Sequence, residues 1–110
     1  MKAKGPLGQK EYPVLIAVHL LGDNAYGISI HAKVEELSGH SVKLPSVYRT
    51  LDRFEDKRYV KSWLADPTDE RGGKRKRYFR LLPAGERALR ESKHLAQRIA
   101  DAIEELGEIV

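Results

Sequence analysis

Residues 72–82 read Gly-Gly-Lys-Arg-Lys-Arg-Tyr-Phe-Arg-Leu-Leu, a glycine turn that leads into alternating cationic and aromatic side chains. Six basic residues occupy the ten positions from Arg71 to Arg80. Lys and Arg that neutralise phosphates release condensed counterions, so a β-ribbon of this kind is suited to lie against a polyanion. It is a poor design for a catalytic pocket. The stretch predicts the wing of a winged helix-turn-helix, meaning the β-hairpin that follows its helices.

The segments before this ribbon complete the same fold. Apolar residues recur at helical spacing in three stretches, and alternating β-forming residues mark two strands. The predicted helices cover residues 9–21, 28–37 and 44–58, and the predicted strands cover residues 59–64 and 76–82. Two helices joined by a short turn, the second with a basic face, form a helix-turn-helix. The predicted fold class is mainly α with a small β-hairpin, a winged helix-turn-helix.

A further helix is predicted to begin at Pro83, and its apolar positions alternate in steps of four and three. They are Ala88, Ser92, Leu95, Ile99, Ala102, Leu106 and Ile109. This a/d heptad pattern favours a dimer over packing on the first helix. The expected dimer interface consists of Ala88, Leu95, Ile99, Ala102, Leu106 and Ile109. The chain is therefore divided into a mobile arm (1–8), a DNA-binding domain (9–82) and a C-terminal dimerisation helix (83–110).

Composition sets limits on the functional class. The chain has 110 residues, which suits one domain. Residues 43–80 hold 12 Lys and Arg against 6 Asp and Glu, a balance of +6 in a chain of net charge +4. That basic middle suits a surface that faces nucleic acid. The absence of cysteine excludes disulfides, thiolate zinc sites and cysteine nucleophiles. The longest apolar run, Val14–Leu21, is too short to span a bilayer, and we expect a cytoplasmic protein.

The order of several motifs resembles the PadR-type transcriptional regulators. The resemblance covers nearly all of residues 9–91. It includes Gly22 followed by Tyr26-Gly27-Ile28, then Val34-Glu35-Glu36-Leu37-Ser38-Gly39, Tyr48, and Leu51 followed by Phe54-Glu55. Its most specific part is residues 72–85, which are similar to the wing signature of that family. Leu82-Pro83 departs from the usual threonine at the start of the last helix. The resemblance implies a short subfamily with one C-terminal helix, and a hydroxyl of Tyr48 close to DNA.

A second resemblance competes with the first. Ser46-Val47-Tyr48-Arg49-Thr50-Leu51 is also similar to the recognition helix of the Fur-type iron-uptake repressors. Those proteins carry metal sites in a further dimer domain, for which this chain has no room. The four histidines are scattered without ligand spacing, so we expect no metal site and no cofactor.

The predicted DNA-binding residues fall into two groups. Base edges are read mainly from the N-terminal part of a recognition helix, here taken as the helix over 44–58. The expected base-reading residues are Ser46, Arg49, Thr50 and Arg53. The expected phosphate contacts are Lys43, Tyr48, Lys57, Lys74, Lys76 and Arg77. Arg49 and Arg53 are alternatively phosphate contacts or members of ion pairs within the helix, and Tyr48 is alternatively a packing residue.

These observations predict a sequence-specific regulator of transcription, a repressor that binds double-stranded DNA as a homodimer on a pseudo-palindromic operator. The alternative is a winged-helix protein-interaction module whose C-terminal helix joins another partner. An enzyme is not expected, because the sequence offers no pairing of a nucleophile with a base. The operator, the target genes and the identity of any small-molecule effector are left open.

Overall fold

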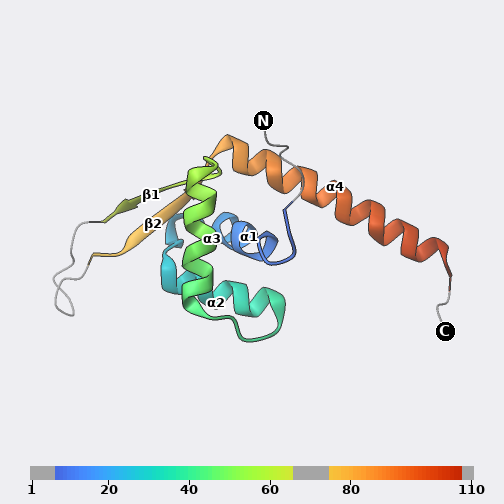
Figure 1. The fold of residues 1–110 in the computed structure, drawn as a ribbon, viewed down its shortest axis with the longest axis horizontal. Coiled ribbons are helices and arrows are strands. Elements are labelled where there is room, and N and C mark those ends of the chain that lie inside the picture. The colour runs from blue at the N-terminus through green and yellow to red at the C-terminus, as the bar shows by residue number, and fades with distance from the viewer. Residues whose placement is uncertain (1–6, 66–74, 108–110) are drawn as a thin grey trace.

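The computed structural model describes residues 7–65 and 75–107. Within these ranges the chain forms four α-helices, one short 3₁₀ helix and a two-stranded antiparallel sheet. In chain order they are α1 (Tyr12–Leu21), η1 (Gly22–Asn24), α2 (Gly27–Ser38), α3 (Leu44–Asp56), β1 (Val60–Leu64), β2 (Arg77–Leu81) and α4 (Pro83–Glu105). The predicted order of helices and strands is confirmed, and so is the fold class (Figure 1).

The helix boundaries follow local chemistry. Three of the helices, α1, α3 and α4, carry proline in the first turn, where the missing N–H removes no hydrogen bond. The helix predicted to start at residue 9 begins only at Tyr12, because residues 8–11 form a turn closed by the Glu11 N–H on the Gly8 carbonyl. The helix predicted to reach residue 58 ends at Asp56. Its continuation is broken by Arg58, whose φ of 63° is left-handed.

The hydrophobic core lies between the first three helices and the hairpin. Its largest fully buried side chains are Phe54, Phe79, Leu15, Ile30, Leu51, Val18, Val47 and Val60. Along α2, Ile30 and Val34 are buried, whereas Leu37, which continues their helical spacing, is 44% exposed. Leu37 lies in the last turn of α2.

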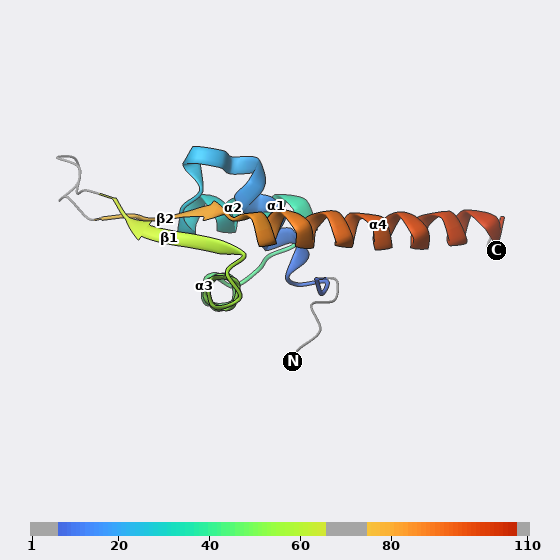
Figure 2. The same cartoon turned by 90° about the horizontal axis from the view of Figure 1, so that it is seen from above.

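The hairpin is held in a defined register. Ser62 pairs with Phe79 and Trp63 pairs with Tyr78, and the Phe79 N–H also donates to the Ala25 carbonyl at 2.9 Å. The backbone before α2 therefore adds a bridge to β2, at Tyr26. Figures 1 and 2 show the hairpin extending from one end of the domain while α4 extends from the other.

The N-terminal half of α4 belongs to the domain. Gly85, Ala88 and Ser92 are buried, and the Leu7 N–H donates to the Ser92 hydroxyl at 3.0 Å. The chain is thus attached to the domain from Leu7 onward, inside the arm expected over 1–8. Residues 1–6 of that arm lie outside the described residues. None of the described helices has the length and apolar character needed to cross a membrane.

Candidate nucleic-acid interface

Helix α3 presents one polar stripe away from the core. Val47, Leu51 and Phe54 are buried on its inner side. Arg49 and Arg53 are exposed on the outer side, as predicted. In Figure 2, where α3 is seen end-on, no other element of the described chain covers its outer side. The helix therefore has the exposure that entry into a major groove requires.

Thr50 does not belong to this outer stripe, and its expected place there is wrong. It is only 4% exposed, and its hydroxyl accepts a hydrogen bond from the Arg53 guanidinium at 3.2 Å. The reason is geometric, since Thr50 lies three residues after Val47 and shares its side of the helix. Thr50 can hold Arg53 in place but cannot reach a base edge. Ser46 is half-buried.

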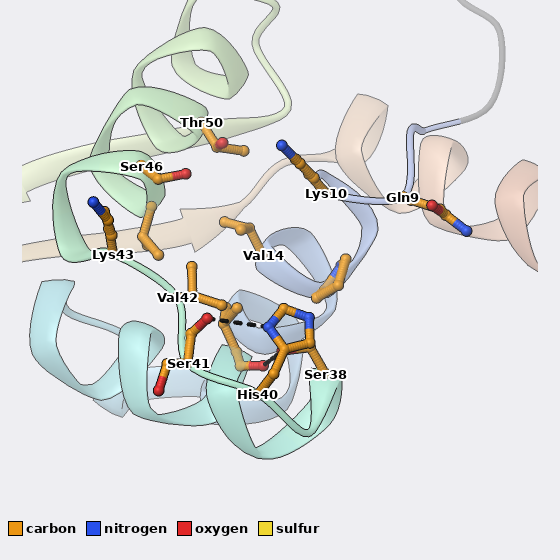
Figure 3. A pocket seen from close by; sticks show the side chains of 13 residues that line it. Gln9, Lys10, Val14, Ser38, His40, Ser41, Val42, Lys43, Ser46 and Thr50 are labelled. Carbon is orange, nitrogen blue, oxygen red and sulfur yellow. Dashed lines mark hydrogen bonds between the residues drawn. The ribbon is translucent and has the colours of Figure 1, made fainter.

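A hollow of about 660 Å³ opens beside the first two turns of α3. Figure 3 shows its lining from four places: the turn before α1, the start of α1, the C-terminal part of α2 with the loop after it, and α3. Lys43 and Ser46, both predicted to contact DNA, line this hollow, and Lys10 lies across from them. Lys10 was not predicted as a site residue. Its only signal in the sequence was its position just before a predicted helix. Its place near Ser46 could not be predicted, because that approach depends on the tertiary fold.

Tyr48 packs inside the helix-turn-helix. Its ring and hydroxyl cover Gly27 so closely that a Cβ at position 27 would overlap them. The side chain is half-buried, so the packing alternative for Tyr48 holds, and its hydroxyl lies at the start of α2. A contact between that hydroxyl and DNA stays a prediction.

Arg77 occupies a different environment from the one predicted. Its guanidinium donates to Glu55 Oε1 at 2.6 Å and to the Ser62 hydroxyl at 3.1 Å, and it lies 3.4 Å from Asp52 Oδ1. It also lies 4.9 Å from the centre of the Phe79 ring. The hydrogen bond from Ser62, followed by Arg77, lowers the pKa of Glu55. Arg77 thus joins the wing to α3 instead of pointing free toward a phosphate.

The opposite face of the wing combines aromatic rings and cations. The Trp63 ring stacks on Tyr78, with centroids 6.1 Å apart, and Tyr78 also packs against Tyr26. Lys76 lies 4.3 Å from the Tyr26 ring centre and Arg80 lies 5.8 Å from that of Trp63. Both cations remain exposed. The predicted alternation along β2 is confirmed, because Phe79 is buried while its neighbours Tyr78 and Arg80 face the other way.

The remaining predicted phosphate contacts differ in their surroundings. Lys57 has its ammonium 3.8 Å from Glu11 Oε2 and 5.7 Å from the Tyr59 ring centre, at the end of α3 away from the hollow. Lys74 lies outside the described residues, as do Arg71 and the glycine turn. The Arg49 alternative of an ion pair with Asp52 finds no support in the described ranges, where the partner of Asp52 is Arg77.

The heptad positions of α4 divide into two groups. Ala88 is 4% exposed within its own domain, so its expected place in a dimer interface is wrong. Further along, Ile99, Ile103 and Leu106 are 52%, 51% and 69% exposed. Leu95 is half-buried and Ala102 is exposed, while Ile109 lies outside the described residues. Ile103 was missed because it falls one position beyond the strict a/d pattern.

Two histidines of the described chain have a ring nitrogen close to a backbone carbonyl oxygen. His31 Nε2 lies 2.6 Å from the Val42 carbonyl, and His40 Nδ1 lies 3.1 Å from the Ser41 carbonyl. Among residues 7–65 and 75–107, no three side chains of metal-ligating type come together.

The fold and this surface define a winged helix-turn-helix protein. Residues 17–91 match the model of the transcriptional regulator PadR-like family, which is well over half of the chain. The chain thus belongs to the PadR-like family of transcriptional regulators, which are DNA-binding proteins and not enzymes.

Solved structures show the same fold. A PadR family transcription regulator from Clostridium difficile is 24% identical, with 90% of this chain and 98% of that chain covered and a TM-score of 0.73. A PadR-like transcriptional regulator from Bacillus cereus is 18% identical, with 91% and 92% covered and a TM-score of 0.73. A transcriptional regulator from Clostridium thermocellum is 20% identical, with 90% of each chain covered and a TM-score of 0.71.

One curated relative matches by sequence. It is an uncharacterised 37.1 kDa protein in transposon Tn4556 of Streptomyces fradiae, 33% identical over 90 residues. The match covers 82% of this chain but only 24% of that protein. The chain spans about a quarter of the length of this relative.

Proposed function

We propose that this regulator binds a pseudo-palindromic operator as a homodimer and represses transcription. The observation that carries the proposal is the uncovered outer stripe of α3, which carries the exposed side chains of Arg49 and Arg53. Arginine pairs with guanine through two hydrogen bonds in the major groove, and each such pair contributes about 1–3 kcal/mol of discrimination. Base reading is thus assigned to Arg49 and Arg53, with Ser46 next to them.

Phosphate binding is assigned to exposed cations outside the base-reading stripe of α3. Lys43 precedes its first turn, and Lys76 lies at the root of the wing. Lys43 and Lys76 are both exposed. Tyr48, Lys57 and Lys74 are kept as further phosphate-binding residues. Each cation that neutralises a phosphate would add to the salt dependence of binding.

The dimer is proposed to form through the second half of α4. Exposed Ile99, Ile103 and Leu106 form an apolar stripe on a helix that projects beyond the domain. A stripe of this kind is stabilised by burial against a partner helix. Two recognition helices related by a two-fold axis would then read half-sites about one helical turn apart. Because chromosomal DNA is the target, the proposed location is the cytoplasm.

The test is selection of bound sequences from random double-stranded DNA, followed by titration against salt. A double variant, Lys43→Ala with Lys76→Ala, is expected to lower the slope of log affinity against log salt by roughly 0.9 for each phosphate that is no longer neutralised. Lys93→Ala, an exposed lysine on α4, is the matched control and should leave the slope unchanged. If no sequence is enriched, specific DNA recognition is wrong. If the double variant keeps the wild-type slope, the phosphate assignments are wrong.

A further inference from the structure

Asp52 lies on the outer stripe of α3 among the proposed base-reading residues. It is three residues after Arg49, so these two side chains are neighbours on the surface of the helix. The Asp52 side chain is 60% exposed. A carboxylate on a surface that faces phosphates is repelled by them, so its presence there calls for an explanation.

Arg77 forms an ion pair with this carboxylate. Its NH1 atom lies 3.4 Å from Asp52 Oδ1, while NH2 donates to Glu55 Oε1 and Nε donates to the Ser62 hydroxyl. The Ser62 hydroxyl in turn donates to Glu55 Oε2 at 2.8 Å. The guanidinium is thus held by Glu55, by Ser62 and by the Phe79 ring beside it. The positive charge of this held guanidinium offsets part of the repulsion between Asp52 and DNA phosphates.

A carboxylate oriented in this way accepts hydrogen bonds only, which limits what it can recognise. In the major groove, Asp and Glu side chains accept from the amino group on cytosine N4, whereas the amino group on adenine N6 lies beside the acceptor N7, which disfavours a carboxylate. Guanine and thymine offer acceptors at the corresponding edge and would face the carboxylate with like charge. Asp52 is therefore suited to distinguish cytosine from those bases.

We propose that Asp52, held by Arg77 from the wing, is a specificity-determining residue that selects cytosine at one position of each half-site. This inference rests on the proposed entry of α3 into the major groove. It assigns Arg77 the role of a positioning residue, in place of the phosphate contact expected from the sequence. The wing then contributes to base recognition without touching a base.

The experiment compares sequences selected by the wild-type protein and by Asp52→Asn. Asparagine pairs with adenine through N6 and N7, so the variant should replace the preference for cytosine by one for adenine at that position. We expect a change of about tenfold in relative affinity between the two bases, with the other positions unchanged. Asp56→Asn is the matched control, an exposed aspartate one turn further along α3, and should leave the selected sequence unchanged.

Arg77→Ala separates positioning from phosphate binding. We expect it to weaken the cytosine preference while the salt slope stays as in the wild type. A slope lower by about 0.9 would instead identify a phosphate contact and overturn the positioning role. If the wild-type protein enriches a sequence and Asp52→Asn enriches the same one, the assignment of Asp52 is wrong and the proposed function stands. If the wild-type protein enriches none, the proposed function itself fails.

Discussion

The phenol of Tyr48 packs directly against the backbone of Gly27, so the recognition helix α3 contacts the first residue of α2. No side chain larger than hydrogen fits at position 27 while Tyr48 keeps this place. The close packing sets how near α2 and α3 approach each other at the start of the helix-turn-helix. It also explains why a glycine begins a helix here, although φ at this position is not left-handed.

Gly27→Ala is expected to destabilise the domain by about 1–3 kcal/mol, the usual range for overpacking a filled site. The added methyl group must push the Tyr48 ring out of its place. The free energy of unfolding from urea denaturation measures the effect. A double variant with Tyr48→Ala provides the control, because removal of the ring removes the clash. The two changes should therefore cost less together than the sum of their separate costs, and simple additivity would contradict the close packing.

Gly85 allows a second close approach, between the start of α4 and the segment that follows α3. A Cβ there would lie 2.8 Å from Leu81 Cδ1 and 3.1 Å from the Tyr59 carbonyl carbon. Because Tyr59 contributes backbone here, the neighbour cannot move aside as a side chain can. Gly85→Ala should lower the free energy of unfolding by about 1–3 kcal/mol. The control is Ala96→Gly on the exposed part of α4, which should cost only about 1 kcal/mol through helix propensity. An unaffected Gly85→Ala variant would show that α4 is not packed as described.

Glu55 should give the protein an acid-sensitive component of stability. The Ser62 hydroxyl and Arg77 lower the pKa of this carboxyl below its ordinary value of 4.5. A group with a lowered pKa in the folded state stabilises the fold above its unfolded value and loses that effect as pH falls through the folded value. We therefore expect Glu55→Gln to be less stable than the wild type at neutral pH, and this difference to shrink below pH 4.5.

Unfolding curves over a pH series measure this difference. Asp56→Gln is a control from the same helix, since Asp56 is exposed at its C-terminal end. Its difference from the wild type should vary less with pH than that of Glu55→Gln. A Glu55→Gln difference that is constant across the series would show that the charge of Glu55 does not support the fold.

The order of elements was predictable because each one carries a local signal. Proline in first turns, glycine at turns and a period of 3.6 or 2 act within a few residues and need no knowledge of the rest of the chain. Thr50 was placed wrongly because its polarity was given more weight than its helical spacing. Its polarity suggested the outer side, whereas the helical spacing from Val47 placed it inside, where the Arg53 guanidinium satisfies its hydroxyl.

The site was less predictable because its charges act across the fold. Arg77 and Asp52 are 25 positions apart, and only the docking of the wing on α3 brings them together. A count of cations along residues 71–80 treats each one as free, so it assigned Arg77 to phosphate. The approach of Lys10 to the first turns of α3 depends on tertiary packing in the same way.

The dimer proposal gives the last prediction, which concerns the half of α4 that leaves the domain. Ile99→Lys with Ile103→Lys should convert a dimer to a monomer, because both side chains are half-exposed here and would carry charge into the partner helix. Sedimentation equilibrium measures the mass. Arg98→Ala, an exposed residue next to Ile99, is the control and should leave the dimer intact. The domain itself should stay folded, since its core does not include these positions. A wild-type protein that sediments as a monomer at all concentrations would contradict the dimer, and a double variant that stays dimeric would place the interface elsewhere.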